Sequence, residues 1–190
     1  MSRIILASAS PRRRELMELA GYDFEVICAD IVEAVPENVQ PQEVVMSLAL
    51  QKAQAVAKDH CKSAVVGSDT VVALDGKILG KPKNDENARE MLKFLSGKAH
   101  SVFTGVTLIK GDITRSFSVE TKVKFFDLTD EEIDEYIKTG EPADKAGAYG
   151  IQDHFEIVKE YKGSLNNVIG LPIEDIKPKL DRLLIINPTK

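Results

Sequence analysis

The chain has no tryptophan, few aromatic residues and only two cysteines among its 190 residues. Cys28 and Cys61 stand alone, without the CxxC spacing of zinc or redox sites. The first residues show no signal-peptide pattern, and no apolar run is long enough to span a membrane. We therefore expect a cytoplasmic protein with reduced thiols and no membrane contact.

Basic residues are in the minority, because 25 lysines and arginines stand against 30 aspartates and glutamates. The net charge of −5 and the pI near 5.3 argue against a nucleic-acid binder, whose phosphate contacts need a basic face. Hydrophobic residues make up 43%, which is enough for a proper core. Since the chain has no internal repeat, low-complexity tract or linker, residues 1–190 predict a single domain, which could form two lobes.

One basic cluster stands out near the start of the chain. Residues 4–7 are an apolar run typical of a short buried strand, and Ser10 before Pro11 predicts a helix N-terminus. Three arginines in the first turn oppose the helix dipole, which favours acidic residues there. Hydroxyls, free N–H groups and guanidinium forks match a phosphate chain. The candidates for this phosphate cradle are Ser8, Ser10, Arg12, Arg13 and Arg14. The alternative is a solvated basic face with an ordinary serine cap.

Two charged residues further along could reach the same site. The acidic loop around residues 30–37 contains Glu33, which could point inward, although most such carboxylates are simply solvated. The next predicted helix, residues 42–58, carries Lys52 in the middle of its apolar face. That lysine either extends along the surface to solvent or points into a cleft, where its ammonium needs an anion.

The most apolar run, residues 63–74, predicts a strand through the centre of a sheet. Asp69 interrupts this run, and a carboxylate there needs a cation, a metal or the rim of a site. The Gly-Ser pair before it allows close approach of another group. We favour a functional role for Asp69 over a structural one. An Asp-Gly pair then predicts a hairpin turn, after which Lys81 is presented between a glycine and a proline.

The remaining elements predict the scaffold of a mixed α/β sheet. Residues 99–109 and 115–126 have the pattern of an antiparallel hairpin. Capping signals and apolar spacing predict further helices at 84–96, 129–139 and 173–184. The stretch 144–152, with small residues around one aromatic, suits a tight loop against a planar ligand or, equally, a turn that packs on itself.

Several of these segments form a known set of motifs. They are Leu6-Ala7-Ser8-x-Ser10-Pro11-Arg12-Arg13, Gly67-x-Asp69-Thr70, Gly80-Lys81-Pro82, Leu95-Ser96-Gly97, Asp144-Lys145-Ala146-Gly147-Ala148-Tyr149-Gly150-Ile151-Gln152 and Gly170-Leu171-Pro172. In this order they resemble the Maf family of nucleoside triphosphate pyrophosphatases over nearly the whole chain. The resemblance implies an elongated mixed β-sheet flanked by helices, with two lobes around a cleft, similar to the inosine triphosphatase fold. It also implies a divalent metal, magnesium or manganese, and often a homodimer.

The resemblance assigns roles to individual residues. Asp69 matches the family's proposed proton acceptor, and Glu33 matches a carboxylate of the same cleft. The phosphate side is matched by Ser8, Arg12, Arg13, Lys52 and Lys81. Positions linked to substrate choice are matched by Arg12, Thr70 and Gln152.

The stretch from Lys145 to Gln152 resembles the branch of the family that acts on dTTP and UTP, rather than the branch that acts on 7-methyl-GTP. The sequence departs from that branch directly after Gln152. That branch usually has Gly-x-Gly after the glutamine, whereas this chain has Asp153-His154-Phe155. The loop shape and the exact base preference are therefore open.

The implied reaction is attack of water on the α-phosphorus of a nucleoside triphosphate, with release of pyrophosphate. Cationic side chains and a metal would neutralise charge on the phosphate oxygens. Asp69 would take the water's proton or hold the metal, since both roles need a carboxylate near the same water. A rival hypothesis is a regulator, linked to the septum inhibition associated with the Maf name, that binds nucleotide without turnover. The set of Asp69, Lys52 and Lys81 favours the enzyme.

Overall fold

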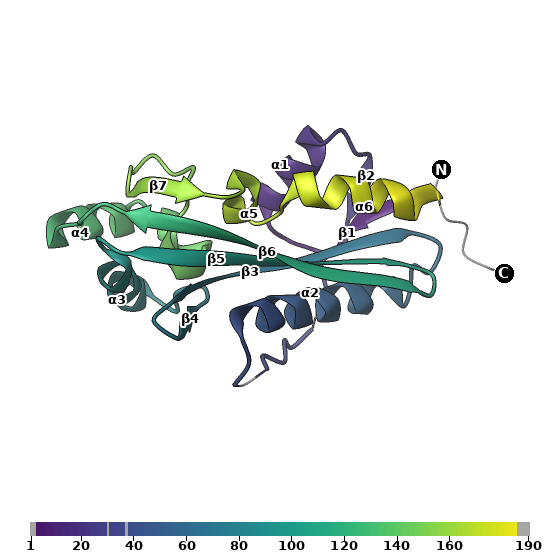
Figure 1. Cartoon of the computed structure of the whole chain (residues 1–190), viewed down its shortest axis with the longest axis horizontal. Helices are drawn as coiled ribbons and strands as arrows, with labels where there is room; N and C mark the ends of the chain where they lie inside the picture. Colours follow the sequence, from purple (N-terminus) through teal and green to yellow (C-terminus); the bar gives the residue numbers. More distant parts are fainter. Residues whose placement is uncertain (1–2, 30, 37, 186–190) are drawn as a thin grey trace. The chain divides into compact units, whose positions relative to one another are not determined.

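The computed structural model describes residues 3–29, 31–36 and 38–185. Within them lies a seven-stranded sheet with strand order β2-β1-β3-β5-β6-β7, and β4 pairs with β3 (Figure 1). The strands are β1 Ile4–Leu6, β2 Phe24–Val26, β3 Ala64–Leu74, β4 Lys77–Leu79, β5 Ala99–Lys110, β6 Ile113–Phe125 and β7 Val158–Lys162. The helices are α1 Pro11–Leu19, α2 Pro41–Ala57, α3 Asp85–Leu95, α4 Asp130–Lys138, α5 Leu165–Ile169 and α6 Ile173–Ile185, with 3-10 turns η1 Glu141–Asp144 and η2 Ala146–Ala148. Strand β1 is parallel to β2 and β3, whereas β4 and β7 are antiparallel to their neighbours, which confirms the predicted mixed α/β class.

The chain divides into two compact units. The first unit comprises Met1–Asp69, Thr104–Val119 and Gly170–Lys190, and the second comprises Thr70–Phe103 and Glu120–Ile169. Strands β3, β5 and β6 contribute residues to both. No helix in the described part of the chain is long and apolar enough to cross a membrane.

Helix α2 packs closely against the sheet of the first unit because two strand positions have no side chain. A Cβ at Gly67 of β3 would lie 2.5 Å from the carbonyl oxygen of Ala49, and one at Gly105 of β5 would lie 2.3 Å from that of Val45. The helix contributes the buried face predicted from its spacing, namely Val45, Leu48, Ala49, Ala53 and Val56. The two glycines therefore set how near the helix backbone comes to the strands.

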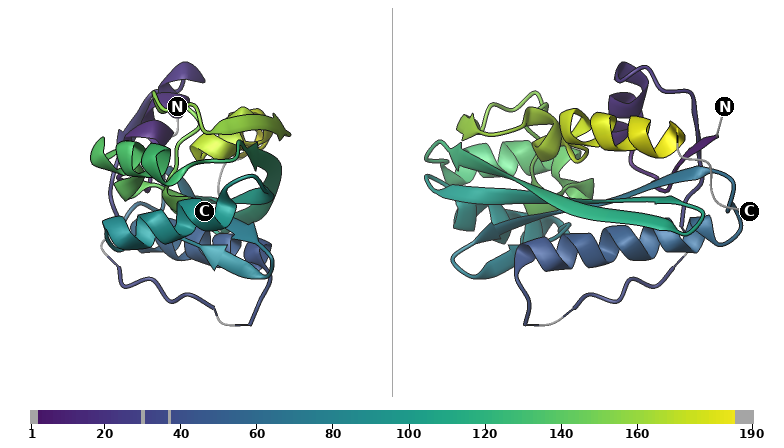
Figure 2. Two further views of the ribbon diagram at one scale, coloured as in Figure 1. Left: turned by 90° about the vertical axis from the view of Figure 1, so that its left-hand side faces the viewer. Right: turned by 45° about the vertical axis from the view of Figure 1, so that its right-hand side comes forward.

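Helix α6 covers the opposite face of the same strands. Ile109 of β5 belongs to a buried cluster with Ala53 and Val56 of α2. The next residue, the fully buried Lys110, donates through Nζ to the carbonyl oxygens of Leu183 (3.2 Å) and Leu184 (2.9 Å) near the end of α6. Since neighbouring strand residues point to opposite faces, the two helices lie on opposite sides of this part of the sheet, as both views of Figure 2 show.

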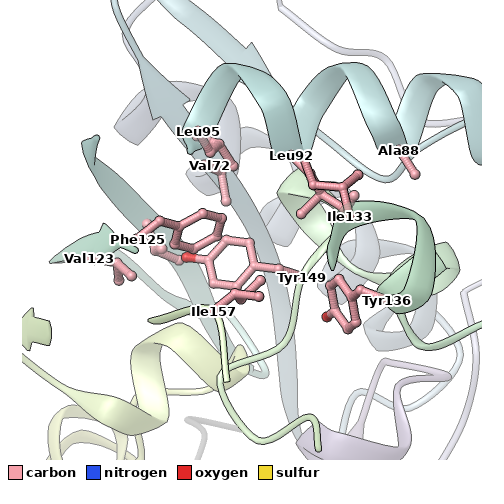
Figure 3. Close-up of a cluster of buried hydrophobic side chains, with 12 residues drawn as sticks. Val72, Ala88, Leu92, Leu95, Val123, Phe125, Ile133, Tyr136, Tyr149 and Ile157 are labelled. Carbon is pink, nitrogen blue, oxygen red and sulfur yellow. The ribbon is translucent and has the colours of Figure 1, made fainter. Parts of the chain in front are cut away.

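The second unit has its own core, built mainly by α3, α4, the ends of three strands and the segment after η2. Figure 3 shows the rings of Phe125 and Tyr149 side by side, with Leu92 and Leu95 of α3 next to them. The ring centroids of Phe125 and Tyr149 are 4.7 Å apart in an edge-to-face arrangement, which suits aromatic pairs. The segment 144–152 thus packs on itself and on the core, and this supports the second of the two alternatives predicted for it.

The local signals in the sequence place most boundaries correctly. The Asp75-Gly76 pair has φ values of 50° and 75°, as a tight hairpin turn requires, and it joins β3 to β4. Thr129 and Glu132 form the predicted capping box of α4. Helix α6 continues through Pro178. Strand β7 and helix α5 were not predicted, because each has only five residues and β7 is largely exposed.

Candidate functional site

The candidate site in the first unit begins at the N-terminus of α1. Ser10 is the N-cap residue, with φ −69° and ψ 120°, and its side chain accepts from the backbone N–H of Arg13. The buried Ser8 hydroxyl accepts from the N–H of Ser10 at 3.2 Å. The two serines therefore fix the turn that leads from β1 into the helix, as the sequence predicts.

The side chain of Arg13 points inward from this turn. Its Nε donates to the carbonyl oxygen of Gly170 at 2.8 Å, and its Nη1 donates to Ser8 Oγ at 3.2 Å. Burial lowers the pKa of the guanidinium, the negative charges of Asp69 and Glu33 raise it, and Arg12 lowers it. An arginine remains charged in proteins, so Arg13 places a fixed positive charge within the field of both carboxylates.

The sequence left two interpretations for the three arginines of the turn, a phosphate cradle and a solvated basic face, and the structure supports a different one for different residues. Arg14 is exposed and pairs with Glu18 one turn later, with 2.8 Å between Nε and Oε1. It belongs to a solvated face. Arg12 is half-buried, and its charge acts on Arg13. The phosphate-cradle hypothesis is thus left with Arg12 and Arg13.

Lys52 lies between two carboxylates. Its Nζ is 2.5 Å from Asp69 Oδ1 and 3.0 Å from Glu33 Oε1. The side chains of Lys52 and Asp69 are only 16% and 14% exposed, and that of Glu33 is 40% exposed. Lys52 therefore meets anions instead of merely extending to solvent, and Asp69 has the cation that its place in an apolar strand requires. We call Lys52, Asp69 and Glu33 the charged triad.

Ser68, the residue before Asp69, anchors the same strand to two neighbouring segments. It is fully buried, and its hydroxyl can donate to the carbonyl oxygen of Gly105 (3.0 Å) or of Gly170 (3.1 Å). The Gly170 carbonyl, which also accepts from Arg13, thereby links α1 with β3. This role of Ser68 was not predicted from the sequence, where a hydroxyl inside an apolar strand was the only available signal.

Gln51 holds the loop that carries Glu33. Its Oε1 accepts from the N–H of Ala34 at 2.9 Å, and its Nε2 donates to the carbonyl of the same residue at 2.8 Å. Nε2 also lies 3.2 Å from Ser47 Oγ. The side-chain amide pairs with this backbone as a neighbouring strand would. This contact was not predicted from the sequence, since the partner of the Gln51 amide is a main-chain group in a loop without periodicity.

Three predicted site residues belong to the second unit. Thr70 is half-buried on β3, Lys81 is exposed after β4, and Gln152 is exposed in the turn after η2. The backbone near Lys81 is fixed, because the N–H of Gly147 donates to the carbonyl of Gly80 at 3.0 Å. The roles of these three residues stay predictions.

Tyr149, the aromatic residue of the same segment, faces the core. Its hydroxyl lies 2.8 Å from Nε2 of the buried His100, and both rings contact Phe125 edge to face. Burial raises the pKa of Tyr149 and lowers that of His100 to about 4. Tyr149 therefore has a structural role in the core of the second unit.

Comparison with known proteins gives consistent results. A model of the family described as Maf-like protein matches residues 3–183. A dTTP/UTP pyrophosphatase of Bacillus cereus (strain ZK / E33L) is 50% identical over 186 residues, which is 97% of each chain. That of Bacillus mycoides (strain KBAB4) is 51% identical over 174 residues, or 91% of each chain.

Among solved structures, the Ham1 protein of Staphylococcus aureus matches with a TM-score of 0.55 at 16% identity, over 96% of this chain and all of that one. A HAM1 protein from Coxiella burnetii gives the same values. At such low identity the likeness shows the fold alone. It confirms the predicted mixed sheet flanked by helices, which this chain shares with the Ham1 proteins.

Proposed function

The chain belongs to the Maf family and is a nucleoside triphosphate pyrophosphatase, and from this premise we propose that its substrates are dTTP and UTP. Relatives that are about half identical to this chain over nearly its whole length are named dTTP/UTP pyrophosphatases. The observation that supports the chemistry best is the charged triad, in which Lys52 lies between Asp69 and Glu33 within the field of Arg13. A cation beside a carboxylate suits a reaction that neutralises phosphate charge and removes a proton from water.

In the proposed reaction, the oxygen of a water molecule forms a bond to the α-phosphorus. The bond from that phosphorus to the bridging oxygen breaks, and pyrophosphate leaves with the electron pair. The water's proton passes to a carboxylate oxygen of Asp69. Lys52, Arg13 and Arg12 stabilise the negative charge on the phosphate oxygens. Ser8 and Ser10 keep the α1 turn in place for these contacts.

The residues present fit a divalent metal, magnesium or manganese. Asp69 and Glu33 each bring a carboxylate oxygen within 3.0 Å of one point, the Nζ of Lys52. Magnesium is typically held by one or two carboxylates together with substrate phosphates, so two carboxylates suffice. When bound, the metal would supply charge stabilisation at the phosphate oxygens. Glu33 and one carboxylate oxygen of Asp69 would be its ligands, which leaves the other oxygen of Asp69 to accept the water's proton.

Product analysis tests the function. The purified protein is incubated with UTP, dTTP and 7-methyl-GTP in the presence of magnesium or manganese, and the products are separated by ion-exchange chromatography. We expect UMP and dTMP together with pyrophosphate. Release of UDP and orthophosphate would overturn the bond assignment, and faster turnover of 7-methyl-GTP would overturn the choice of substrates. Tight binding of UTP without turnover would instead support a regulatory protein.

Three further statements remain predictions. They are a single domain over residues 1–190, a cytoplasmic location and a homodimer. Sedimentation analysis of the full chain tests the last of these.

A further inference from the structure

The loop that carries Glu33 has no regular structure to fix it. Among the described residues between the end of β2 at Val26 and the start of α2 at Pro41, none belongs to a helix or a strand. Long loops of this kind are uncommon in compact domains and usually serve a function. Glu33 nevertheless has a defined place, with its Oε1 3.0 Å from the Nζ of Lys52. Contacts with side chains must therefore hold the loop where it is.

The side-chain amide of Gln51 supplies such a contact. It accepts from the N–H of Ala34 at 2.9 Å and donates to the carbonyl oxygen of Ala34 at 2.8 Å. One planar amide thus meets both backbone groups of a single residue, as an opposite residue does in an antiparallel pair. Two consecutive residues of α2, Gln51 and Lys52, thereby contact two consecutive residues of the loop, Ala34 and Glu33.

Ser47 lies one turn before Gln51 on the same helix and determines which way the amide faces. The Nε2 of Gln51 lies 3.2 Å from Ser47 Oγ. An amide nitrogen carries two donors, so Nε2 can bond to Ser47 and to the Ala34 carbonyl together, and Oε1 then faces the Ala34 N–H. Both Ser47 and Gln51 are half-buried, whereas Ala34 is exposed. The helix therefore fixes the amide, and the amide fixes the loop.

The two carboxylates of the charged triad differ in how firmly their backbone is held. Asp69 lies within strand β3, between neighbouring strands of the sheet. Glu33 has only the loop, and its side chain is 40% exposed. A divalent metal shared by the two carboxylates needs both at a fixed separation. Residues that orient a metal ligand without touching the metal typically change metal affinity or activity by about 10–100-fold when they are replaced.

We propose that Gln51 is a positioning residue for the divalent metal, because it holds the backbone of Ala34 and so keeps the Glu33 carboxylate beside Lys52 and Asp69. The proposal rests on the proposed function, in which these two carboxylates hold the metal. Gln51 contacts the loop backbone and is not itself a metal ligand. Its replacement should therefore change metal affinity through Glu33 alone.

The first measurement is binding of Mn²⁺ to the purified protein without nucleotide, followed by the electron paramagnetic resonance signal of free Mn²⁺. Gln51→Met keeps an unbranched side chain that favours a helix and removes both hydrogen bonds to Ala34. We expect it to bind Mn²⁺ about tenfold more weakly than the wild type. Ser47→Ala removes only the group that orients the amide, so its effect should have the same direction and be smaller.

Gln54→Met is the matched control, since it makes the same substitution at an exposed position of the same helix. Its affinity for Mn²⁺ should equal that of the wild type. The double variant Glu33→Gln/Gln51→Met tests the route of the effect. If Gln51 acts through Glu33, the double variant should bind Mn²⁺ no more weakly than Glu33→Gln alone.

Two further measurements separate positioning from a general structural role. The backbone N–H of Ala34 donates to Gln51 Oε1, so its hydrogen exchange should be faster in Gln51→Met than in the wild type. In UTP hydrolysis, the Mn²⁺ concentration for half-maximal activity should rise by the same factor as the binding constant, whereas kcat at saturating Mn²⁺ should stay within about twofold of the wild type.

Any of four results would overturn the proposal. They are a wild type that binds no Mn²⁺, equal Mn²⁺ affinity of the wild type and Gln51→Met, a further loss of affinity when Gln51→Met is added to Glu33→Gln, and equal hydrogen exchange at Ala34 in the wild type and Gln51→Met. Failure of the proposed function is a different result. The wild type would then release no UMP and pyrophosphate from UTP, while Mn²⁺ binding and hydrogen exchange would still decide the role of Gln51.

Discussion

Replacing Lys52 by methionine separates the two contributions of the charged triad. On sequence grounds alone, a methionine on an apolar helix face would be neutral or stabilising. The structure predicts the opposite, because the Lys52 ammonium stands 2.5 Å from Asp69 and 3.0 Å from Glu33. Lys52→Met leaves two carboxylates facing one another without their shared cation.

The expected loss of stability follows from burial. Removing one partner of a fully buried pair costs about 3–5 kcal/mol, whereas exposed pairs contribute about 0–1 kcal/mol. Lys52 and Asp69 are close to the buried limit, and Glu33 is 40% exposed and can turn to water. We therefore expect the free energy of unfolding at pH 7 to fall by about 2 kcal/mol, between those limits. UTP turnover should fall by at least about a hundredfold, because a charge that stabilises the transition state is lost.

Urea unfolding and UTP hydrolysis measure the two effects on the same preparations. Lys58→Met is the control, since Lys58 is exposed at the end of the same helix and should change stability by no more than about 0.5 kcal/mol. The double variant Lys52→Met/Asp69→Asn should regain part of the stability while remaining inactive, because one uncompensated charge is gone. A Lys52→Met protein that is both stable and active would refute the role of the triad.

Further variants test the neighbouring groups. Asp69→Asn should lower UTP turnover by about two orders of magnitude or more in a folded protein, and near-normal turnover would remove Asp69 from the mechanism. Gln51→Ala should lower kcat/KM for UTP several-fold, because it releases the loop that carries Glu33. Gln54→Ala, at an exposed position on the same helix, should leave kcat/KM unchanged. Equal effects of the two variants would contradict the role of Gln51 in holding this loop. Burial lowers the folded-state pKa of His100 from 6.5 to about 4, so the ring stays neutral in the folded protein. The stability that depends on a neutral His100 is therefore fully present above pH 6.5 and is lost as the pH falls toward 4. Between pH 7 and 4.5 the wild type should lose about 2 kcal/mol of unfolding free energy that His100→Gln does not lose. Urea unfolding at the two pH values measures this difference, and equal losses in the two proteins would count against the argument.

The elements that the sequence predicted well depend on local chemistry. The Ser10-Pro11 start of α1, the capping box at Thr129 and the Asp75-Gly76 turn each follow from residues within one turn of chain. Strand β7 gave no such signal, because its one aliphatic residue, Val158, is followed by lysine, glutamate, tyrosine and lysine. A short charged strand of this kind is typical of a sheet edge, and its pairing with β6 depends on contacts distant in sequence.

The site residues were recognised singly, from a conflict between residue type and surroundings. A lysine on an apolar helix face and an aspartate in an apolar strand each needed a partner. That Lys52 and Asp69 are partners of one another could not be read from the sequence, because it depends on how closely α2 approaches β3. Gly67 allows this approach, and the only sign in the sequence was a glycine within a buried strand.

The charges of the triad bear on how a nucleotide could enter the site. One ammonium is shared by two carboxylates, so at neutral pH the formal charge of Lys52, Asp69 and Glu33 together is negative. A triphosphate would be attracted by Arg13 and Arg12, which act on the same site, but it would be repelled by the two carboxylates and would compete with Asp69 for the ammonium of Lys52. Asp69 and Glu33 would hold a divalent cation, which would supply positive charge to offset the two carboxylates. Lys52 could then turn from Asp69 to the phosphates without leaving a carboxylate uncompensated. The same geometry that satisfies the side chains without substrate thus favours a substrate bound together with its metal.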